Sequence, residues 1–421
     1  MILNNSPKRK KNHAYIVNGI YNYYAGFSDF FVKDQLETYV KNQNAVVLDP
    51  WNGSGTTTLV STVLGIKNYG FDINPVMVII AKAKLYNKDS LRIKDIENLA
   101  KTKRVQVEGD SSDPLNLWFL PDSVKKIRML ERIIFDDFFE SKKVKYISEL
   151  EDISSLTPKQ CFLYVCFFKL MKAVTKDFVG TNPTWVKSKI REEQKKDITY
   201  SALLDLLISI IEEAPYLSTD MERNTSIISL GDSTNLLLAN DSVDLVLTSP
   251  PYCTRIDYAV YTIVELALLG ISGKRFIQLR KSMIGTPTIT ENGILDDEVI
   301  LPNKCIDILN NISIHSSKAA STYYYKTYCQ YFISMLRSAK ELYRVLGKDC
   351  KAIIVVQDSW FKDIHIDMSS IMEELFLSSG FALEKSNMVH VKNTMSYLNP
   401  KMSIKNKQKK YIESILDFRK V

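Results

Sequence analysis

The chain has 421 residues, 45% of them hydrophobic and 24% charged, so it can bury a sizeable core in one large domain or two. No apolar run reaches membrane-spanning length and no secretory leader pattern opens the chain, which argues against membrane and secreted classes and favours the cytoplasm. Its 55 Lys and Arg residues against 48 Asp and Glu residues give a formal net charge of +7, gathered partly in short basic runs, which suits a polyanionic partner without requiring one.

The cysteines and histidines predict neither a disulfide framework nor a metal site. The six cysteines include no CxxC pair, so we expect reduced thiols. The four histidines lie far apart without metal-ligand spacing, and we therefore predict no metal.

Strand-like segments alternate with helical patterns along the chain. The alternation predicts an α/β fold with a parallel sheet, whose binding sites gather at the carboxyl ends of the strands. We expect strands over residues 45–49, 68–72, 226–232, 243–247 and 351–358, and helices over 56–65 and 325–347.

The first predicted strand ends in DPWNGSGTT, residues 49–57. Gly53 and Gly55 permit a tight turn with close backbone approach to a ligand, and the following helix offers its amino-terminal amides. No Lys follows in a phosphate-loop arrangement. Asp49 would repel a phosphate and attract an ammonium or sulfonium group, so the turn favours a ligand that is cationic at that end.

The second predicted strand ends in GFDINP, residues 70–75. Asp72 lies where an acidic residue can accept hydrogen bonds from both hydroxyls of a ribose. Together with the cation-tolerant first turn, this spacing favours S-adenosylmethionine. A Rossmann-like turn that serves NAD is the alternative interpretation.

The fourth predicted strand runs into LTSPPYCTRIDY, residues 247–258. The Ser249 hydroxyl and the Pro250 carbonyl can accept hydrogen bonds from the two N–H groups of a base amine and orient its lone pair. Pro251 keeps the loop rigid, and Tyr252 can stack on a base flipped out of a duplex. The plain alternative is a strand-terminating turn with a packing tyrosine.

These three segments resemble the donor and catalytic motifs of the amino DNA methyltransferases, the family that modifies cytosine N4 or adenine N6. The resemblance implies a seven-stranded, Rossmann-like sheet that binds S-adenosylmethionine, with Asp49 at the methionine end of the cofactor and Asp72 at its ribose. The segment 13–40 is similar to the family's amino-terminal donor motif, in which Tyr24, Gly26, Phe27 and Ser28 would close over the methionine. The predicted cofactor site is completed by Pro50, Gly53, Ser54, Gly55, Thr56, Ile73, Asn74 and Asp232.

Two Gly-Asp pairs compete for a place near the adenine amine of the cofactor. Asp232 is preferred over Asp110, because it directly precedes the catalytic strand, with a helix and turn expected over 233–242.

The predicted domains are a donor-binding half at 1–84, a catalytic half at 225–421, and between them a large, mainly helical insertion at 85–224, a candidate target-recognition region. Thr157 and Pro158 are typical of a helix start within the insertion. A second DNA-contacting insertion is expected at 271–320. The predicted DNA-contacting residues are Arg255, Lys274, Arg275, Arg280, Lys281, Lys187 and Lys189. A solvated basic loop is the alternative for the last two, and Arg255 and Asp257 can equally form a local ion pair.

The sequence thus predicts a site-specific methyltransferase that acts on double-stranded DNA, in a restriction-modification or phage-defence system with a separate restriction or defence subunit. Ser249 resembles the cytosine-N4 members, whereas Asp or Asn at this position is commoner in adenine-N6 members. An RNA base-amine methyltransferase and a non-catalytic nucleic-acid-binding homologue are the alternatives.

Overall fold

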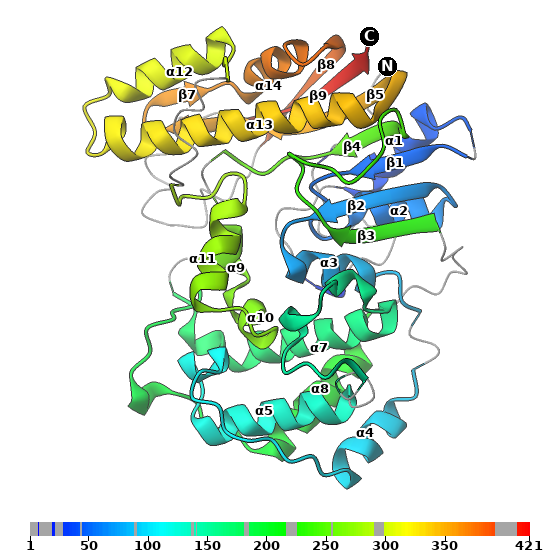
Figure 1. The fold of residues 1–421 in the computed structure, drawn as a ribbon, viewed down its shortest axis with the longest axis vertical. Helices are drawn as coiled ribbons and strands as arrows, with labels where there is room; N and C mark the ends of the chain where they lie inside the picture. Colours follow the sequence, from blue (N-terminus) through cyan, green and yellow to red (C-terminus); the bar gives the residue numbers. More distant parts are fainter. Residues whose placement is uncertain are drawn as a thin grey trace.

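The computed structural model describes residues 7, 19–21, 28–42, 44–87, 91–135, 139, 141–180, 185–215, 225–253, 256–289, 299–391 and 411–421. In this part of the chain, a twisted sheet with helices on both faces adjoins a body made of helices alone (Figure 1).

The sheet has seven strands in the order β3-β2-β1-β4-β5-β9-β8. The first five are parallel, and β9 is antiparallel to both of its neighbours. The predicted α/β fold with a seven-stranded sheet is therefore confirmed, with a reversed strand near the carboxyl terminus. The strands are β1 (Val46–Asp49), β2 (Lys67–Asp72), β3 (Ser226–Leu230), β4 (Val243–Thr248), β5 (Leu346–Gln357), β8 (Phe381–Val391) and β9 (Tyr411–Lys420), and β6 (Ser359–Phe361) with β7 (Ile364–Ile366) forms a separate hairpin.

Helices cover both faces because the central strands are apolar on both sides. In β1, Val47 packs with the helices of one face and Leu48 with those of the other. The first face carries α1 (Asp29–Tyr39), α2 (Thr56–Val63) and α3 (Pro75–Ala83), and the second carries α12 (Asn303–Ser313), α13 (Tyr325–Val345) and α14 (Met368–Leu377).

The residues between β2 and β3 form the helical body at the far end of the molecule from α13 (Figure 1). Its longest helix, α7, begins as predicted, with a capping box between Thr157 and Gln160 and with Pro158 in the first turn. The helices of this body are α4 (Ile93–Thr102), α5 (Pro121–Ile134), α7 (Pro158–Val174) and α8 (Tyr200–Glu213). Shorter turns of helix lie at Pro114–Leu117, Ile147–Glu149, Ile153–Ser155, Lys176–Phe178 and Glu192–Gln194.

The apolar core of the helical body continues into α3 and into α10 (Ile263–Leu268), which follows the Ser-Pro-Pro-Tyr loop at 249–252. The helical body therefore packs against both halves of the sheet domain, through α3 from the first half and α10 from the second. The proposed domain limits stay a prediction.

The expected helix over 233–242 is wrong, because the structure has only turns between β3 and β4. The chain passes over β2 and β1 to reach β4, about 14 Å across the sheet, in extended and turn conformations. Side chains of α13 satisfy this extended backbone. The Leu236 amide donates to Glu341, and the Arg344 guanidinium donates to the carbonyls of Leu236 and Leu238.

Among the described helices, none combines the length and the apolar character that crossing a bilayer would require. The described residues also contain no group of three or more His, Cys, Asp or Glu side chains arranged to hold a metal ion. Burial raises the pKa of the Cys161 and Cys305 thiols to about 12, so these two residues serve as small core side chains.

Candidate active site

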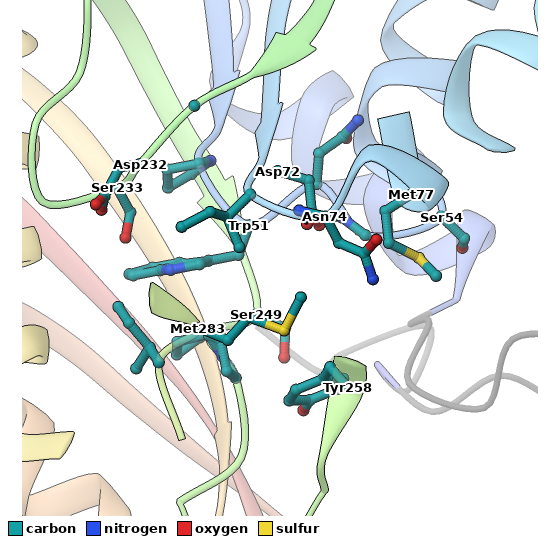
Figure 2. Close-up of a pocket in the computed structure, with 18 of the residues that line it drawn as sticks. Trp51, Ser54, Asp72, Asn74, Met77, Asp232, Ser233, Ser249, Tyr258 and Met283 are labelled. Atoms are coloured by element: carbon teal, nitrogen blue, oxygen red, sulfur yellow. Dashed lines mark hydrogen bonds between the residues drawn. The ribbon is translucent and has the colours of Figure 1, made fainter. Parts of the chain in front are cut away.

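The carboxyl ends of β1, β2 and β4 open onto one cleft of about 980 Å³, a volume that includes the solvent at its mouth. Figure 2 shows Asp72 and Asn74 at the end of β2, together with Asp232 after β3 and Ser249 after β4. The fold thus brings the donor turn and the proline loop together. The predicted residues that line the cleft are Pro50, Gly53, Ser54, Thr56, Asp72, Ile73, Asn74, Asp232, Ser249, Pro250, Pro251 and Tyr252.

The glycine turn after β1 has the backbone that glycine allows. Gly53 has φ 48° and Gly55 has φ 77°, both in the left-handed region. A Cβ atom on Gly55 would lie 2.6 Å from Cβ of Ala81, so this glycine also lets α2 approach α3 closely. Gly55 lies just behind the cleft lining, at the N-cap of α2.

Asp72 forms part of the cleft wall, and its carboxylate accepts hydrogen bonds from two backbone amides. The Gly53 N–H donates to Oδ2 at 2.9 Å and the Asn74 N–H donates to Oδ1 at 2.8 Å. These bonds hold the carboxylate in one orientation while further lone pairs face the cleft. Burial raises the pKa of Asp72 to about 6.

Asp49 lies beneath the cleft rather than in its lining, with 1% of its surface exposed. Burial raises its pKa to about 6. Its Oδ1 accepts a hydrogen bond from the Thr248 hydroxyl at 2.6 Å and from the Trp51 amide at 3.2 Å. Asp49 can therefore influence a cationic ligand by charge and by fixing the turn.

The Thr248–Asp49 hydrogen bond joins the two motifs directly, because Thr248 immediately precedes Ser249. A second bond, from the Thr57 hydroxyl to the Leu247 carbonyl at 3.2 Å, reinforces the junction. Sequence reasoning missed Thr248, although its place between a buried strand and the proline loop was a visible signal.

In the proline loop, the two predicted acceptors keep their hydrogen-bonding capacity. Among the described residues, neither the half-buried Ser249 hydroxyl nor the Pro250 carbonyl forms a hydrogen bond. Burial raises the pKa of Tyr252 to about 12, so its hydroxyl stays protonated. The loop therefore presents acceptors beside an aromatic ring.

Several residues that line the cleft were not predicted. Trp51 contributes an indole whose buried Nε1–H has no hydrogen-bond partner among the described residues. A flat aromatic ring with an unsatisfied N–H donor suits a heterocyclic ligand such as adenine. The remaining unpredicted lining residues are Asn52, Met77, Gly231, Ser233, Tyr258, Ser282, Met283 and Ile284.

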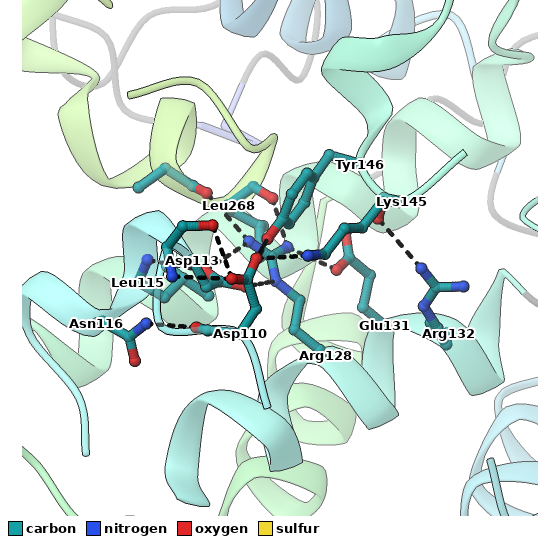
Figure 3. A network of polar contacts seen from close by, with 12 residues as sticks. Asp110, Asp113, Leu115, Asn116, Arg128, Glu131, Arg132, Lys145, Tyr146 and Leu268 are labelled. Atoms are coloured by element: carbon teal, nitrogen blue, oxygen red, sulfur yellow. Dashed lines mark hydrogen bonds and ion pairs between the residues drawn. The ribbon is translucent and has the colours of Figure 1, made fainter. Parts of the chain in front are cut away.

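The structure separates the two Gly-Asp candidates. Asp232 lines the cleft, whereas Asp110 lies in the helical body, where it pairs with Lys145 and accepts a hydrogen bond from Tyr146 (Figure 3). The geometry therefore favours Asp232 for a cofactor contact, and its role stays a prediction.

The predicted amino-terminal donor motif is placed only in part. Tyr24, Gly26 and Phe27 lie outside the described residues. Ser28 is buried, caps α1 through a hydrogen bond from the Phe31 amide, and is absent from the cleft lining. Its predicted contact with the methionine end of a cofactor stays a prediction.

The predicted DNA-contacting residues fall into two groups, and Arg255 lies outside the described residues. Lys187, Lys189, Lys274 and Lys281 are exposed. They remain available for phosphate contacts.

The two arginines of α11 (Gly273–Ser282) instead make contacts within the chain. Arg280 forms an ion pair with Asp257 at 2.6 Å, and Arg275 donates to the Ser148 hydroxyl at 3.1 Å. Arg280 thus holds Asp257, and the predicted alternative of an Arg255–Asp257 ion pair lies outside the described residues. Asp257 also caps α9 (Tyr258–Tyr261), so this pair connects α11 to the end of the proline loop.

Comparison with known proteins identifies relatives along most of the chain, although no protein-family model matches it. The Type II methyltransferase M.BsoBI of Geobacillus stearothermophilus is 27% identical over 284 residues, which cover 62% of this chain and 54% of that protein. The Type II methyltransferase M.AvaI of Nostoc sp. is 23% identical over 394 residues, which cover 87% and 79%. The chain therefore spans about half the length of the Geobacillus relative.

The chain is therefore similar to Type II DNA methyltransferases along most of its length, in agreement with the resemblance to the amino DNA methyltransferases. A shorter match, 35% identical over 115 residues, links it to the Type II methyltransferase M.BamHI of Bacillus amyloliquefaciens. A solved structure of a SAM-dependent methyltransferase from Methanosarcina mazei covers 92% of this chain and 97% of its own chain at 8% identity, with a TM-score of 0.32.

The similarity to methyltransferases indicates S-adenosylmethionine as the cofactor. The residues present fit it, because the Asp72 carboxylate and the Trp51 indole line the same cleft and the buried Asp49 carboxylate lies directly beneath it. Asp72 would hold the ribose hydroxyls, and Trp51 would lie against the adenine.

Proposed function

We propose that this chain methylates the exocyclic amine of a base that is flipped out of double-stranded DNA. The observation that carries the proposal is the pair of acceptors, the Ser249 hydroxyl and the Pro250 carbonyl, which lie in the same cleft as Asp72 and Trp51. A base amine presents two N–H donors, and two acceptors next to the cofactor site match them.

The chemistry assigned to the residues is orientation and charge stabilisation. S-adenosylmethionine, when bound, supplies a methyl group activated by its sulfonium charge. Ser249 and Pro250 would hold the amine so that its lone pair points along the transfer direction, and would stabilise the positive charge that grows on nitrogen. The methylated, positively charged amine would afterwards release one of its two protons to water at the open mouth of the cleft, because neither the Ser249 hydroxyl nor the Pro250 carbonyl is a base at neutral pH.

Tyr252 would support the flipped base. Its ring lines the cleft next to the acceptors, and a ring face is the usual partner of an unstacked base. Taking a base out of the duplex costs a few kcal/mol, and stacking on Tyr252 would offset part of that cost.

Cytosine N4 is the proposed target atom. The support is the resemblance of the Ser-Pro-Pro-Tyr sequence to cytosine-N4 members, since a serine hydroxyl and an aspartate can both accept from an amine. Adenine N6 is the alternative within the same chemistry.

The proposed setting is a restriction-modification or phage-defence system in which a separate subunit cuts or senses unmodified DNA. The support is that the relatives are named Type II methyltransferases. The exposed lysines Lys187, Lys189, Lys274 and Lys281 would contact DNA phosphates.

A transfer assay tests the proposal. The protein is incubated with methyl-labelled S-adenosylmethionine and either unmethylated duplex DNA or total RNA, and the nucleosides are separated by mass spectrometry. We expect N4-methylcytosine in DNA. N6-methyladenine in DNA would move the target atom, label in RNA would replace the substrate class, and tight cofactor binding without label would favour a non-catalytic homologue.

A further inference from the structure

We propose that Tyr258 and Tyr331 are positioning residues that clamp the Pro251–Tyr252 peptide bond and so fix the catalytic loop. The inference rests on the proposed function of the loop and names residues outside its Ser-Pro-Pro-Tyr motif. Tyr331 lies on α13 and Tyr258 begins α9, so the two tyrosines hold the loop from different elements.

Both polar atoms of this peptide bond are bound by a tyrosine hydroxyl. Tyr331 donates to the Pro251 carbonyl at 3.0 Å, and Tyr258 accepts a hydrogen bond from the Tyr252 amide at 3.2 Å. Tyr331 is 2% exposed, so its hydroxyl is shielded from water that would compete for the carbonyl. A peptide bond held at both ends cannot rotate without losing two shielded hydrogen bonds.

A backbone inventory of the loop explains what the clamp achieves. Pro250 and Pro251 have no N–H, so the Tyr252 amide is the single backbone donor between residues 250 and 252. Tyr258 occupies that donor and Tyr331 occupies the Pro251 carbonyl. Among the described residues, the Pro250 carbonyl is left without a partner in the cleft lining. The loop therefore offers acceptors and no backbone donors, as recognition of an amine requires.

Gly285 packs closely against the backbone carbonyl of Tyr252, the last residue of the Ser-Pro-Pro-Tyr loop. A Cβ atom at Gly285 would lie 2.6 Å from the Tyr252 oxygen, closer than the two atoms can approach, and Gly285 has φ 79°. Since Gly285 comes shortly after α11, a movement of that helix would reach the catalytic loop through this contact.

The test compares Tyr331→Phe, which removes only the donor to Pro251, with the wild-type protein. Tyr200→Phe is the matched control, because its hydroxyl also donates to a backbone carbonyl, that of Ala100, but in the helical body. We expect Tyr331→Phe to lower kcat for methyl transfer about 10- to 100-fold, with an unchanged Kd for S-adenosylmethionine and an unchanged KM for DNA. Tyr200→Phe should keep the wild-type kcat.

Two further measurements keep the outcomes distinct. Gly285→Ala, which displaces the loop from behind, should reproduce the kcat loss with cofactor binding retained. Wild-type kcat in both Tyr331→Phe and Gly285→Ala would overturn the clamp, as would a loss of cofactor binding that parallels the loss of kcat. Failure of the wild-type protein itself to transfer methyl groups would instead count against the proposed function.

Discussion

At the scale of single residues, the chemistry of the cleft depends on two hydrogen-bond acceptors without partners and on two carboxylates. Ser249 and Pro250 keep their lone pairs, while Asp49 and Asp72 bring negative charge to the cofactor end at an energetic cost that their raised pKa values express. The two acceptors and the two carboxylates can therefore be tested separately.

Removing the Ser249 hydroxyl should slow the reaction without affecting the cofactor. Ser249→Ala deletes one of two acceptors, so we expect kcat to fall about 100-fold, as for the loss of one group that stabilises a developing charge. The Kd for S-adenosylmethionine, measured by calorimetry, should stay within about twofold. Ser313→Ala, at the carboxyl end of α12 and outside the cleft lining, is the control. An unchanged kcat in Ser249→Ala would remove the assigned role.

Cofactor binding should depend on pH through the buried carboxylates. Burial raises the pKa of Asp49 and of Asp72 from 3.8 to about 6, so both lose their charge as the pH falls through 6. We expect the affinity for S-adenosylmethionine to be constant above about pH 7. Below pH 6 it should fall about tenfold per pH unit for each carboxylate that must be ionised.

The stability of the cofactor-free protein should show the opposite trend. The pKa of each carboxyl is about 6 in the folded protein and 3.8 in the unfolded chain, so the folded state holds these protons more tightly. The resulting contribution to the free energy of unfolding is largest below pH 3.8 and is lost as the pH rises through 6. Asp72→Asn should flatten both pH profiles in part, as followed by calorimetry and thermal unfolding between pH 4 and 8. Identical profiles for Asp72→Asn and the wild type would contradict the assignment.

At the scale of elements, a buried ionic network fixes the helical body against α10. Arg128 on α5 pairs with Asp113 and Glu131 and donates to the carbonyls of Ala267 and Leu268, at the end of α10 (Figure 3). The guanidinium also lies 4.7 Å from the centroid of the Tyr146 ring. One side chain thus connects three segments.

Loss of Arg128 should be severely destabilising. Arg128→Met would leave the carboxylates of Asp113 and Glu131 buried without their cation, so the free energy of unfolding should fall by about 3–5 kcal/mol. Arg132→Met, on the same helix but half-exposed, should cost less than about 1 kcal/mol. Denaturant unfolding of both variants measures the difference, and equal losses would refute the role of the network.

At the scale of the whole molecule, the lysines near the helical body and α11 should govern the salt dependence of DNA binding. Combined Lys187→Gln, Lys189→Gln, Lys274→Gln and Lys281→Gln changes should lower the slope of log affinity against log salt by about 0.9 for each lysine that contacts a phosphate. Fluorescence anisotropy over a salt series measures the slope.

The matched control changes lysines at the opposite edge of the sheet. Lys67 and Lys348 are exposed near the amino ends of β2 and β5, away from the cleft. Lys67→Gln with Lys348→Gln should leave the slope unchanged. If the Lys67/Lys348 variant lowered the slope by as much per substituted lysine as the four-lysine variant, the attraction would be diffuse and would not come from a defined DNA-contacting surface.

Sequence patterns alone were sufficient for the five parallel strands, the class of fold and the motifs of the cleft, but not for β8 and β9. The reason is that these features are local: apolar runs of strand length, glycines that require a left-handed backbone, and prolines that end a strand are all visible over a few residues. Asp49, Asp72, Ser249 and Tyr252 could therefore be chosen before the fold was known.

Tertiary structure decided which distant residues meet. The Thr248–Asp49 bond joins residues 199 positions apart, and the Tyr331 bond to Pro251 spans 80. The pairing of Arg280 with Asp257 and the extended path after β3 likewise depend on strand order and packing. No local pattern contains these contacts, because their energy comes from burial and hydrogen bonding that exist only once the sheet and its helices have assembled.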